Sequence, residues 1–255
     1  MPELSEIGYS RDACVAAVRG YYDFLTKMYL DESDIVEPPE GGWPSITTES
    51  LQSLGKTNEV ILLLRHLPYL RAANSRALSL GRTNSDELRV CSEDPEISED
   101  VPAHVVGLTS GGDEDTPVFL LDTELGIVHC PGCNDGMRHN PSREPVLDDP
   151  YDWAPENEAE WRADAPAWGI ADFFEVLKDQ FRELHFIPIT SRNVVDIWAT
   201  LHPSADGMVA MVQSIYRTHG WPNLERYRKR ECLEAVQKAL QERYPGYEEA
   251  RPDDE

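Results

Sequence analysis

The stretch that most constrains the fold of this chain is TPVFLLDTELGIVHCPGC, which covers residues 116–133. Residues 117–121 and 126–129 are rich in apolar and β-favouring side chains, and Asp122–Gly126 has the composition of a turn. Two such runs around a short turn predict a pair of antiparallel strands. A further run over 104–108 reads as a strand, so the sequence predicts an antiparallel sheet of at least three strands.

Apolar periodicity predicts helices in most of the remaining chain. Apolar residues recur at steps of three and four from Ser10 to about Leu30, and again over 170–184. Thr57 is placed to cap a helix over 58–66, and further helical segments are expected over 194–201, 208–216 and 224–244. Helices that cover an antiparallel sheet form an α+β protein, which is the fold class that we expect.

The organisation expected from length and composition is a single domain over residues 1–255. The polar segment 71–100 is predicted to be a surface loop or an insertion, and 205–247 a helical C-terminal extension. Residues 248–255 are expected to form a frayed tail. The segment 133–167 is rich in Asn, Asp, Glu, Pro and Trp, and this composition predicts a long loop.

The charge of the chain excludes several classes of function. Forty-seven acidic residues stand against 23 basic ones, which gives a formal net charge of −24. Nucleic acids and anionic membranes are bound by clustered Lys and Arg, so we expect neither as a partner, whereas an acidic surface suits a basic protein. No run of 18 apolar residues predicts a membrane span. An acidic N-terminus and an odd number of cysteines, five, predict a cytoplasmic protein with reduced thiols.

The pattern H-C-P-G-C-x5-H is the clearest candidate for site chemistry. Cys130 and Cys133 are spaced so that both sulfurs can bind one zinc ion, and His129 or His139 could supply a third ligand. Redox chemistry would favour a helix after the second cysteine, whereas Asn134-Asp135-Gly136 predicts a turn. A metal site, a redox pair and inert thiols all stay open, and zinc is the one cofactor that the sequence suggests.

Three tryptophans are concentrated near the predicted loop. Trp153, Trp161 and Trp168 either anchor this loop to the sheet or line a surface for a partner or ligand.

The order of these features resembles the SUKH superfamily, the Smi1/Knr4-like fold. The resemblance rests on the acidic Gly-Gly-Asp turn, the FLLD strand, the Gly-Ile-Val strand and the FFEVL helix, and it covers Val105–Cys130 and Ala167–Leu184 best. It implies helices packed on a curved antiparallel sheet. It also implies a protein-binding role, as in bacterial immunity proteins and fungal adaptors, and it carries over no catalytic residues. The phrase LLRHLPY is similar to those of uncharacterised fungal proteins and implies no activity.

Three functions follow as hypotheses. The first is a non-catalytic interaction module that uses the concave sheet face and the loop from Trp153 to Trp168. The second is an enzyme that acts on a small molecule in a pocket under the 134–168 loop. The third is a zinc-stabilised structural domain.

Overall fold

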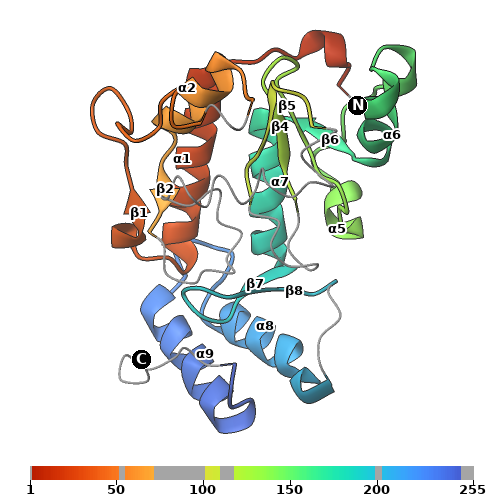
Figure 1. Ribbon diagram of the computed structural model, residues 1–255. Coiled ribbons are helices and arrows are strands. Elements are labelled where there is room, and N and C mark those ends of the chain that lie inside the picture. The colour runs from red at the N-terminus through yellow and green to blue at the C-terminus, as the bar shows by residue number, and fades with distance from the viewer. Residues whose placement is uncertain (1, 52–54, 72–100, 110–117, 199–202, 248–255) are drawn as a thin grey trace. The chain divides into compact units, whose positions relative to one another are not determined.

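The chain folds as an α+β protein with antiparallel sheets, as the sequence predicts (Figure 1). The structure, a computed structural model, describes residues 2–51, 55–71, 101–109, 118–198 and 203–247. The predicted loop over 71–100, apart from Arg71, and the predicted tail over 248–255 lie outside the described residues. No helix among the residues described is both long and apolar enough to cross a membrane.

Two compact units divide the described residues. Unit 1 contains residues 2–22, 33–71 and those described between 101 and 177, and unit 2 contains residues 23–32 and 178–247. Each unit is a group of residues with many contacts among themselves, and the single domain expected over residues 1–255 stays a prediction. Helices α1 (Arg11–Met28) and α7 (Ile170–Glu183) contribute residues to both units.

The sheet of unit 1 contains four antiparallel strands in the order of the sequence. They are β3 (Val105–Gly107), β4 (Leu120–Asp122), β5 (Ile127–His129) and β6 (Ala167–Gly169). The first three confirm the strands that the opening stretch and the run before it predict. Strand β6 was not predicted, because its three residues follow the polar segment directly and are too few to show a period of two.

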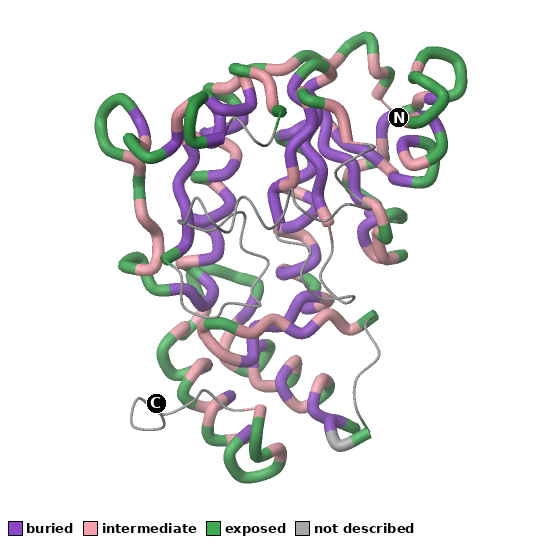
Figure 2. The backbone as a smooth tube through the Cα atoms, viewed as in Figure 1, coloured by how far each residue is buried: buried purple, intermediate pink, exposed green. Residues whose placement is uncertain are grey.

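The two faces of this sheet carry different chemistry. Leu121, Val128 and Trp168 are aligned across β4, β5 and β6 and therefore point to one face. Phe173 of α7 packs on this face, with ring centroids 4.9 Å from Phe119 and 6.4 Å from Trp168. The alternate residues, which include Asp122 and His129, point to the opposite face. Figure 2 shows that β4 and β5 are buried along their length, because both faces are covered.

Among its described residues, unit 1 also contains further helices and a second small sheet. The sheet pairs β1 (Ile35–Val36) with β2 (Tyr69–Leu70). Helix α2 (Asn58–His66) has the predicted bounds, and the Thr57 side chain accepts a hydrogen bond from the N–H of Val60. Three short elements lie within the segment predicted to be a loop: α5 (Asp135–Arg138), the 3-10 helix η4 (Pro150–Asp152) and α6 (Glu156–Asp164).

The loop prediction for 133–167 is therefore wrong over α5, η4, α6 and the start of β6. Side-chain caps that composition does not reveal start two of these elements: Asn134 accepts from the N–H of Met137, and Asp149 accepts from the N–H of Tyr151. Helix α6 buries only Ala159 and Arg162, so it has no apolar periodicity. The prediction of a turn over Asn134-Asp135-Gly136 is also wrong. These residues start the short helix α5, because the Asn134 side chain caps it.

Among its described residues, unit 2 contains a hairpin and two helices of its own, besides the C-terminal ends of α1 and α7. Strands β7 (Phe186–Pro188) and β8 (Val194–Asp196) are antiparallel, and they are followed by α8 (Met208–Thr218) and α9 (Lys229–Arg243). The segment predicted as a helical extension, 205–247, contains α8 and α9. A short 3-10 helix, Pro203–Ala205, also belongs to unit 2, and another, Glu32–Asp34, begins there and ends in unit 1. A further 3-10 helix, Leu4–Glu6, lies in unit 1.

The helical prediction for 194–201 is wrong over its first three residues, which form β8. The N–H of Ile189 donates to the Asn193 carbonyl at 2.9 Å and closes a hairpin turn. Two successive β-branched residues, Val194 and Val195, then suit a strand better than a helix. Residues 199–201 lie outside the described part of the chain.

Candidate functional site

The CPGC segment forms a tight turn at the end of β5. The N–H of Cys133 donates to the carbonyl of Cys130 at 3.2 Å, and Gly132 has φ +66°. Pro at the second position and a glycine with positive φ at the third are typical of a type II turn. Cys130 is buried, whereas Cys133 is partly exposed, and both are free thiols.

The two thiols of this turn are hydrogen bonded to each other, and this bond shifts their pKa values in opposite directions. The hydrogen bond from Cys130 lowers the pKa of Cys133, and the nearby Arg138 lowers it further. Donation of that bond, together with burial, raises the pKa of Cys130. Cys133 is therefore the more readily ionised thiol of the pair.

The two histidines predicted as zinc ligands make their contacts outside the CPGC turn. His139 is exposed and ends α5, where its N–H donates to the carbonyl of Asp135. His129 lies on β5 and contacts Arg162 of α6. Within the described part of the chain, no three His, Cys, Asp or Glu side chains are placed to hold one metal ion. The zinc site at Cys130, Cys133, His129 and His139 stays a prediction.

A buried charged cluster, which we call the Arg162 cluster, covers the sheet face opposite α7. Arg162 is 2% exposed and Asp122 is fully buried, and Nη1 of the arginine donates to Oδ2 of the aspartate at 2.9 Å. Nη1 also lies 3.2 Å from Nε2 of His129. Because a guanidinium can only donate, Nε2 of His129 accepts and the proton of the ring lies on Nδ1.

Two further groups complete the Arg162 cluster. Glu158, one turn earlier on α6, accepts from Nε and Nη2 of Arg162 at 3.0 and 2.9 Å. His104, just before β3, lies with Nε2 3.5 Å from Oδ2 of Asp122. The cluster thus ties α6 to β4, β5 and the residue before β3, and its buried arginine is balanced by two carboxylates, as a buried charge requires.

Burial and charge together keep His129 neutral. Desolvation lowers its pKa to about 4, and the positive charge of Arg162 acts in the same direction, whereas Asp122 opposes it. A neutral imidazole that accepts from Arg162 therefore persists over most of the accessible pH range.

Two of the three predicted tryptophans meet at the Arg162 cluster. The guanidinium carbon of Arg162 lies 4.6 Å from the ring centroid of Trp161 and 5.3 Å from that of Trp153. Nε1 of Trp153 donates to both carboxylate oxygens of Asp148, at 2.9 and 3.0 Å. Contacts on its face and at its edge therefore hold the Trp153 ring in one orientation.

Trp168 does not belong to a partner surface, which corrects that part of the prediction. It is fully buried in β6 and packs against Phe173, and its Nε1 donates to the carbonyl of Arg143 at 3.2 Å. Trp168 is the middle residue of β6 and points to the sheet face on which Phe173 of α7 packs, which explains its burial. Trp153, in contrast, is 41% exposed, and Trp161 is intermediate.

The segment from Leu147 to Trp153, which we call the aromatic segment, exposes three large apolar side chains. Leu147 is 58% exposed and Tyr151 65%, in addition to Trp153. Among the described residues, six large hydrophobic side chains are exposed in total, and half of them belong to this segment. Single exposed apolar residues need no explanation, but a group of three on a short segment marks a candidate binding surface.

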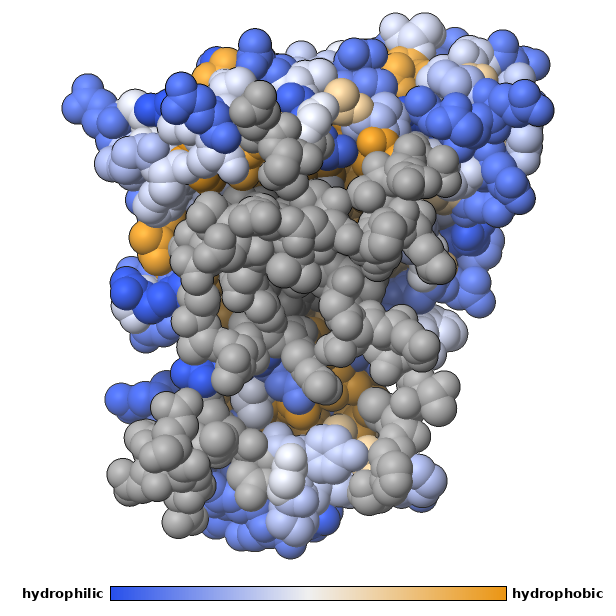
Figure 3. Space-filling model, viewed as in Figure 1, coloured by the Kyte–Doolittle hydropathy of each residue, from blue (hydrophilic) through white to orange (hydrophobic). Residues whose placement is uncertain are grey.

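Carboxylates surround the aromatic segment. Residues 147–164 contain seven acidic residues and one basic residue, Arg162, whose charge is buried and paired; the acidic ones are Asp148, Asp149, Asp152, Glu156, Glu158, Glu160 and Asp164. The surface around α6 is accordingly largely hydrophilic (upper right in Figure 3). The candidate site therefore combines exposed aromatic rings with negative charge.

Sequence reasoning missed Arg162, Asp122 and the exposed Tyr151. The spacing Glu158-x-x-x-Arg162 is a helical ion-pair signal, and it could have pointed to α6. No local signal indicates that Asp122 is the second partner, because the two residues are 40 positions apart.

No protein-family model, curated protein or solved structure matches this chain, so the SUKH resemblance remains an expectation from the sequence.

Proposed function

We propose that this protein is a non-catalytic interaction module that binds a basic polypeptide through the aromatic segment. The observation that carries the proposal is the exposure of Leu147, Tyr151 and Trp153 in a stretch that contains seven acidic residues and a single basic one, the buried Arg162. Tyr and Trp are enriched at the energetic centres of protein interfaces. The SUKH resemblance, which implies a protein-binding role, supports the same function.

The Arg162 cluster prepares this surface for binding. Trp153 is held by Asp148 at its edge and by Arg162 on its face, so little side-chain freedom is lost when a partner covers the ring. The cluster itself is buried and its charges are paired, so it acts behind the surface rather than in contact with the partner.

The charge around the segment indicates the chemistry of the partner. Lys and Arg side chains can stack on the exposed faces of Tyr151 and Trp153 and can pair with Asp149, Asp152 and Glu156 beside them. Tyr151 has the most exposed of these rings. A partner with basic residues interleaved with apolar ones therefore fits the segment best.

Site-directed photo-crosslinking tests this function. A benzophenone amino acid replaces Tyr151 in the full chain, and the matched control carries it at Trp198, a half-exposed tryptophan of unit 2. We expect covalent capture of a basic protein from position 151 and not from position 198. Calorimetry with the purified captured protein then measures the affinity directly.

The variants in this calorimetry are Trp153→Ala and Tyr151→Ala. A residue at the energetic centre of an interface contributes at least about 2 kcal/mol, so we expect at least one of the two to weaken binding about 30-fold. Binding should also weaken as salt is added, because rim charges are screened. Equal affinity of both variants and the unchanged protein, or equal capture from positions 151 and 198, would refute the proposal.

A further inference from the structure

We propose that Cys130 and Cys133 form a thiol–disulfide exchange site, with Cys133 as the attacking thiol and Cys130 as the resolving thiol. This inference is independent of the proposed binding function. It starts from the CPGC turn, whose 3.2 Å backbone hydrogen bond joins its first and last residues.

The turn places the two cysteines at the separation that a disulfide needs. A hydrogen-bonded four-residue turn keeps its end Cα atoms within about 7 Å, and disulfides join Cα atoms about 4.4–6.8 Å apart. The S–S bond can therefore form without rearrangement of the backbone, which Pro131 and Gly132 hold in the turn.

The two cysteines differ in the way that exchange requires. Cys133 is partly exposed, so a small disulfide can reach it. Cys130 is buried, so an external disulfide does not reach it directly, and it is left to resolve the mixed disulfide on Cys133. The other described cysteines, Cys14 and Cys232, are both buried, and burial raises the pKa of each.

The step balances with a low-molecular-weight disulfide as the oxidant. The Cys133 thiolate attacks one sulfur of glutathione disulfide, a mixed disulfide forms, and one glutathione thiolate leaves. The Cys130 thiol loses its proton and attacks the sulfur of Cys133, which forms the Cys130–Cys133 bond and releases the second glutathione. The protein dithiol is oxidised by two electrons, and the disulfide is reduced to two thiols.

Alkylation rates provide the first test. The full-length, reduced protein is treated with iodoacetamide near neutral pH, and peptide mapping follows each cysteine over time. We expect Cys133 to react at least about tenfold faster than Cys130 and Cys14. Comparable rates for Cys130 and Cys133 would overturn the assignment of their roles.

Equilibration with glutathione provides the decisive test. In buffers with increasing glutathione disulfide, the CPGC peptide should lose two hydrogens in one transition, and Cys14→Ser should leave that transition unchanged. Cys130→Ser should accumulate glutathione on Cys133, and Cys133→Ser should accumulate much less on Cys130. The proposal fails if the unchanged protein keeps both thiols in oxidising buffer, or if it holds zinc that must be chelated before oxidation occurs.

Discussion

At the scale of the residue, Asp122 uses its two carboxylate oxygens for different purposes. Oδ1 accepts from the N–H groups of Glu124 and Leu125 at 2.9 and 2.8 Å and so shapes the turn between β4 and β5. Oδ2 accepts from Arg162 and so fixes α6 on the sheet. One buried side chain therefore links the β4–β5 turn to Arg162 and, through it, to α6.

His129 should make the stability of the protein depend on pH. Its pKa is lowered to about 4 in the folded chain, against an ordinary value near 6.5, so the folded state binds fewer protons between these values. Stability from this group is complete above about pH 6.5 and is lost as the pH falls toward about 4. Urea unfolding measures this loss. Between about pH 7.5 and 5, the free energy of unfolding should fall by about 2 kcal/mol more in the unchanged protein than in His129→Gln.

His129→Gln is the matched control because a glutamine oxygen can still accept from Arg162. The same titrating carboxylates are present in both proteins, so their contributions cancel in the difference. Equal pH dependence of the two proteins would show that the histidine is protonated as readily in the folded state as in the unfolded chain.

At the scale of the element, the β4–β5 turn depends on close backbone contact. Gly126 has φ +76°, and a Cβ at this position would lie 2.5 Å from the carbonyl carbon of Gly8. The carbonyl of Gly126 also accepts a hydrogen bond from the N–H of Ile170 at 3.3 Å. The turn is therefore fitted between the N-terminal segment and the start of α7, and only glycine fits there.

Gly126→Ala should destabilise the protein more than Gly41→Ala. Both glycines have positive φ, but a Cβ at Gly41 would meet open space. Positive φ alone costs an alanine about 1–2 kcal/mol, and a clash with backbone adds about 1–3 kcal/mol. We expect urea unfolding to show a loss of about 3 kcal/mol for Gly126→Ala and about 1 kcal/mol for Gly41→Ala. Equal losses would show that the N-terminal segment moves aside at little cost.

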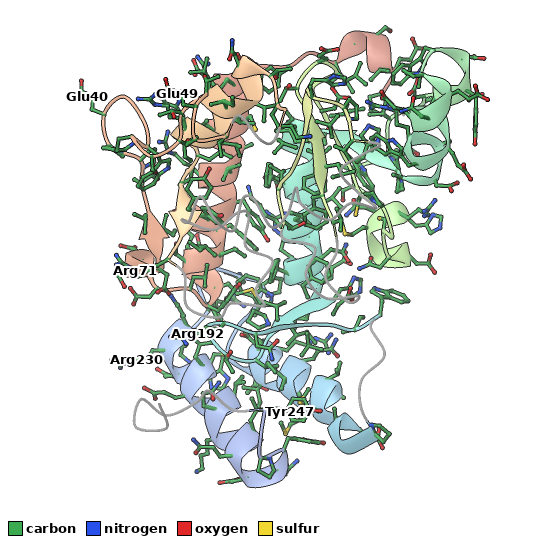
Figure 4. The ribbon with its side chains drawn as sticks, viewed as in Figure 1. Glu40, Glu49, Arg71, Arg192, Arg230 and Tyr247 are labelled. Atoms are coloured by element: carbon green, nitrogen blue, oxygen red, sulfur yellow. The ribbon has the colours of Figure 1, made fainter. Side chains whose placement is uncertain are left out.

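At the scale of the whole molecule, the net charge of −24 opposes the folded state through repulsion among carboxylates. Many of these groups lie on exposed loops; the side chain of Glu40, for example, extends outward from the loop between β1 and α2 (Figure 4). Basic residues offset part of this charge locally, as where Nζ of Lys27 lies 2.6 Å from Oδ2 of Asp23 within unit 2.

Added salt should therefore stabilise this protein. Raising NaCl from about 20 to about 300 mM shortens the screening length severalfold and weakens repulsion between exposed carboxylates. We expect the melting temperature to rise by a few degrees, which corresponds to about 1 kcal/mol for a chain of this size. KCl should act equally, because the effect depends on ionic strength. A melting temperature that falls with salt would show that exposed ion pairs outweigh the repulsion.

The sequence by itself determined the elements whose signal is local. The strands of the opening stretch, the helix over 58–66 and the helix over 170–184 follow from periodicity, turn residues and caps within a few positions of one another. The candidate site could be predicted only in part, as an acidic, tryptophan-rich segment. Tertiary structure decided that β8 is a strand, that Trp168 is buried while Trp153 is exposed, and that Arg162 meets Asp122 and His129 across 40 and 33 positions. Such pairings depend on which sheet face each residue occupies, and the fold sets that through contacts that no local pattern encodes.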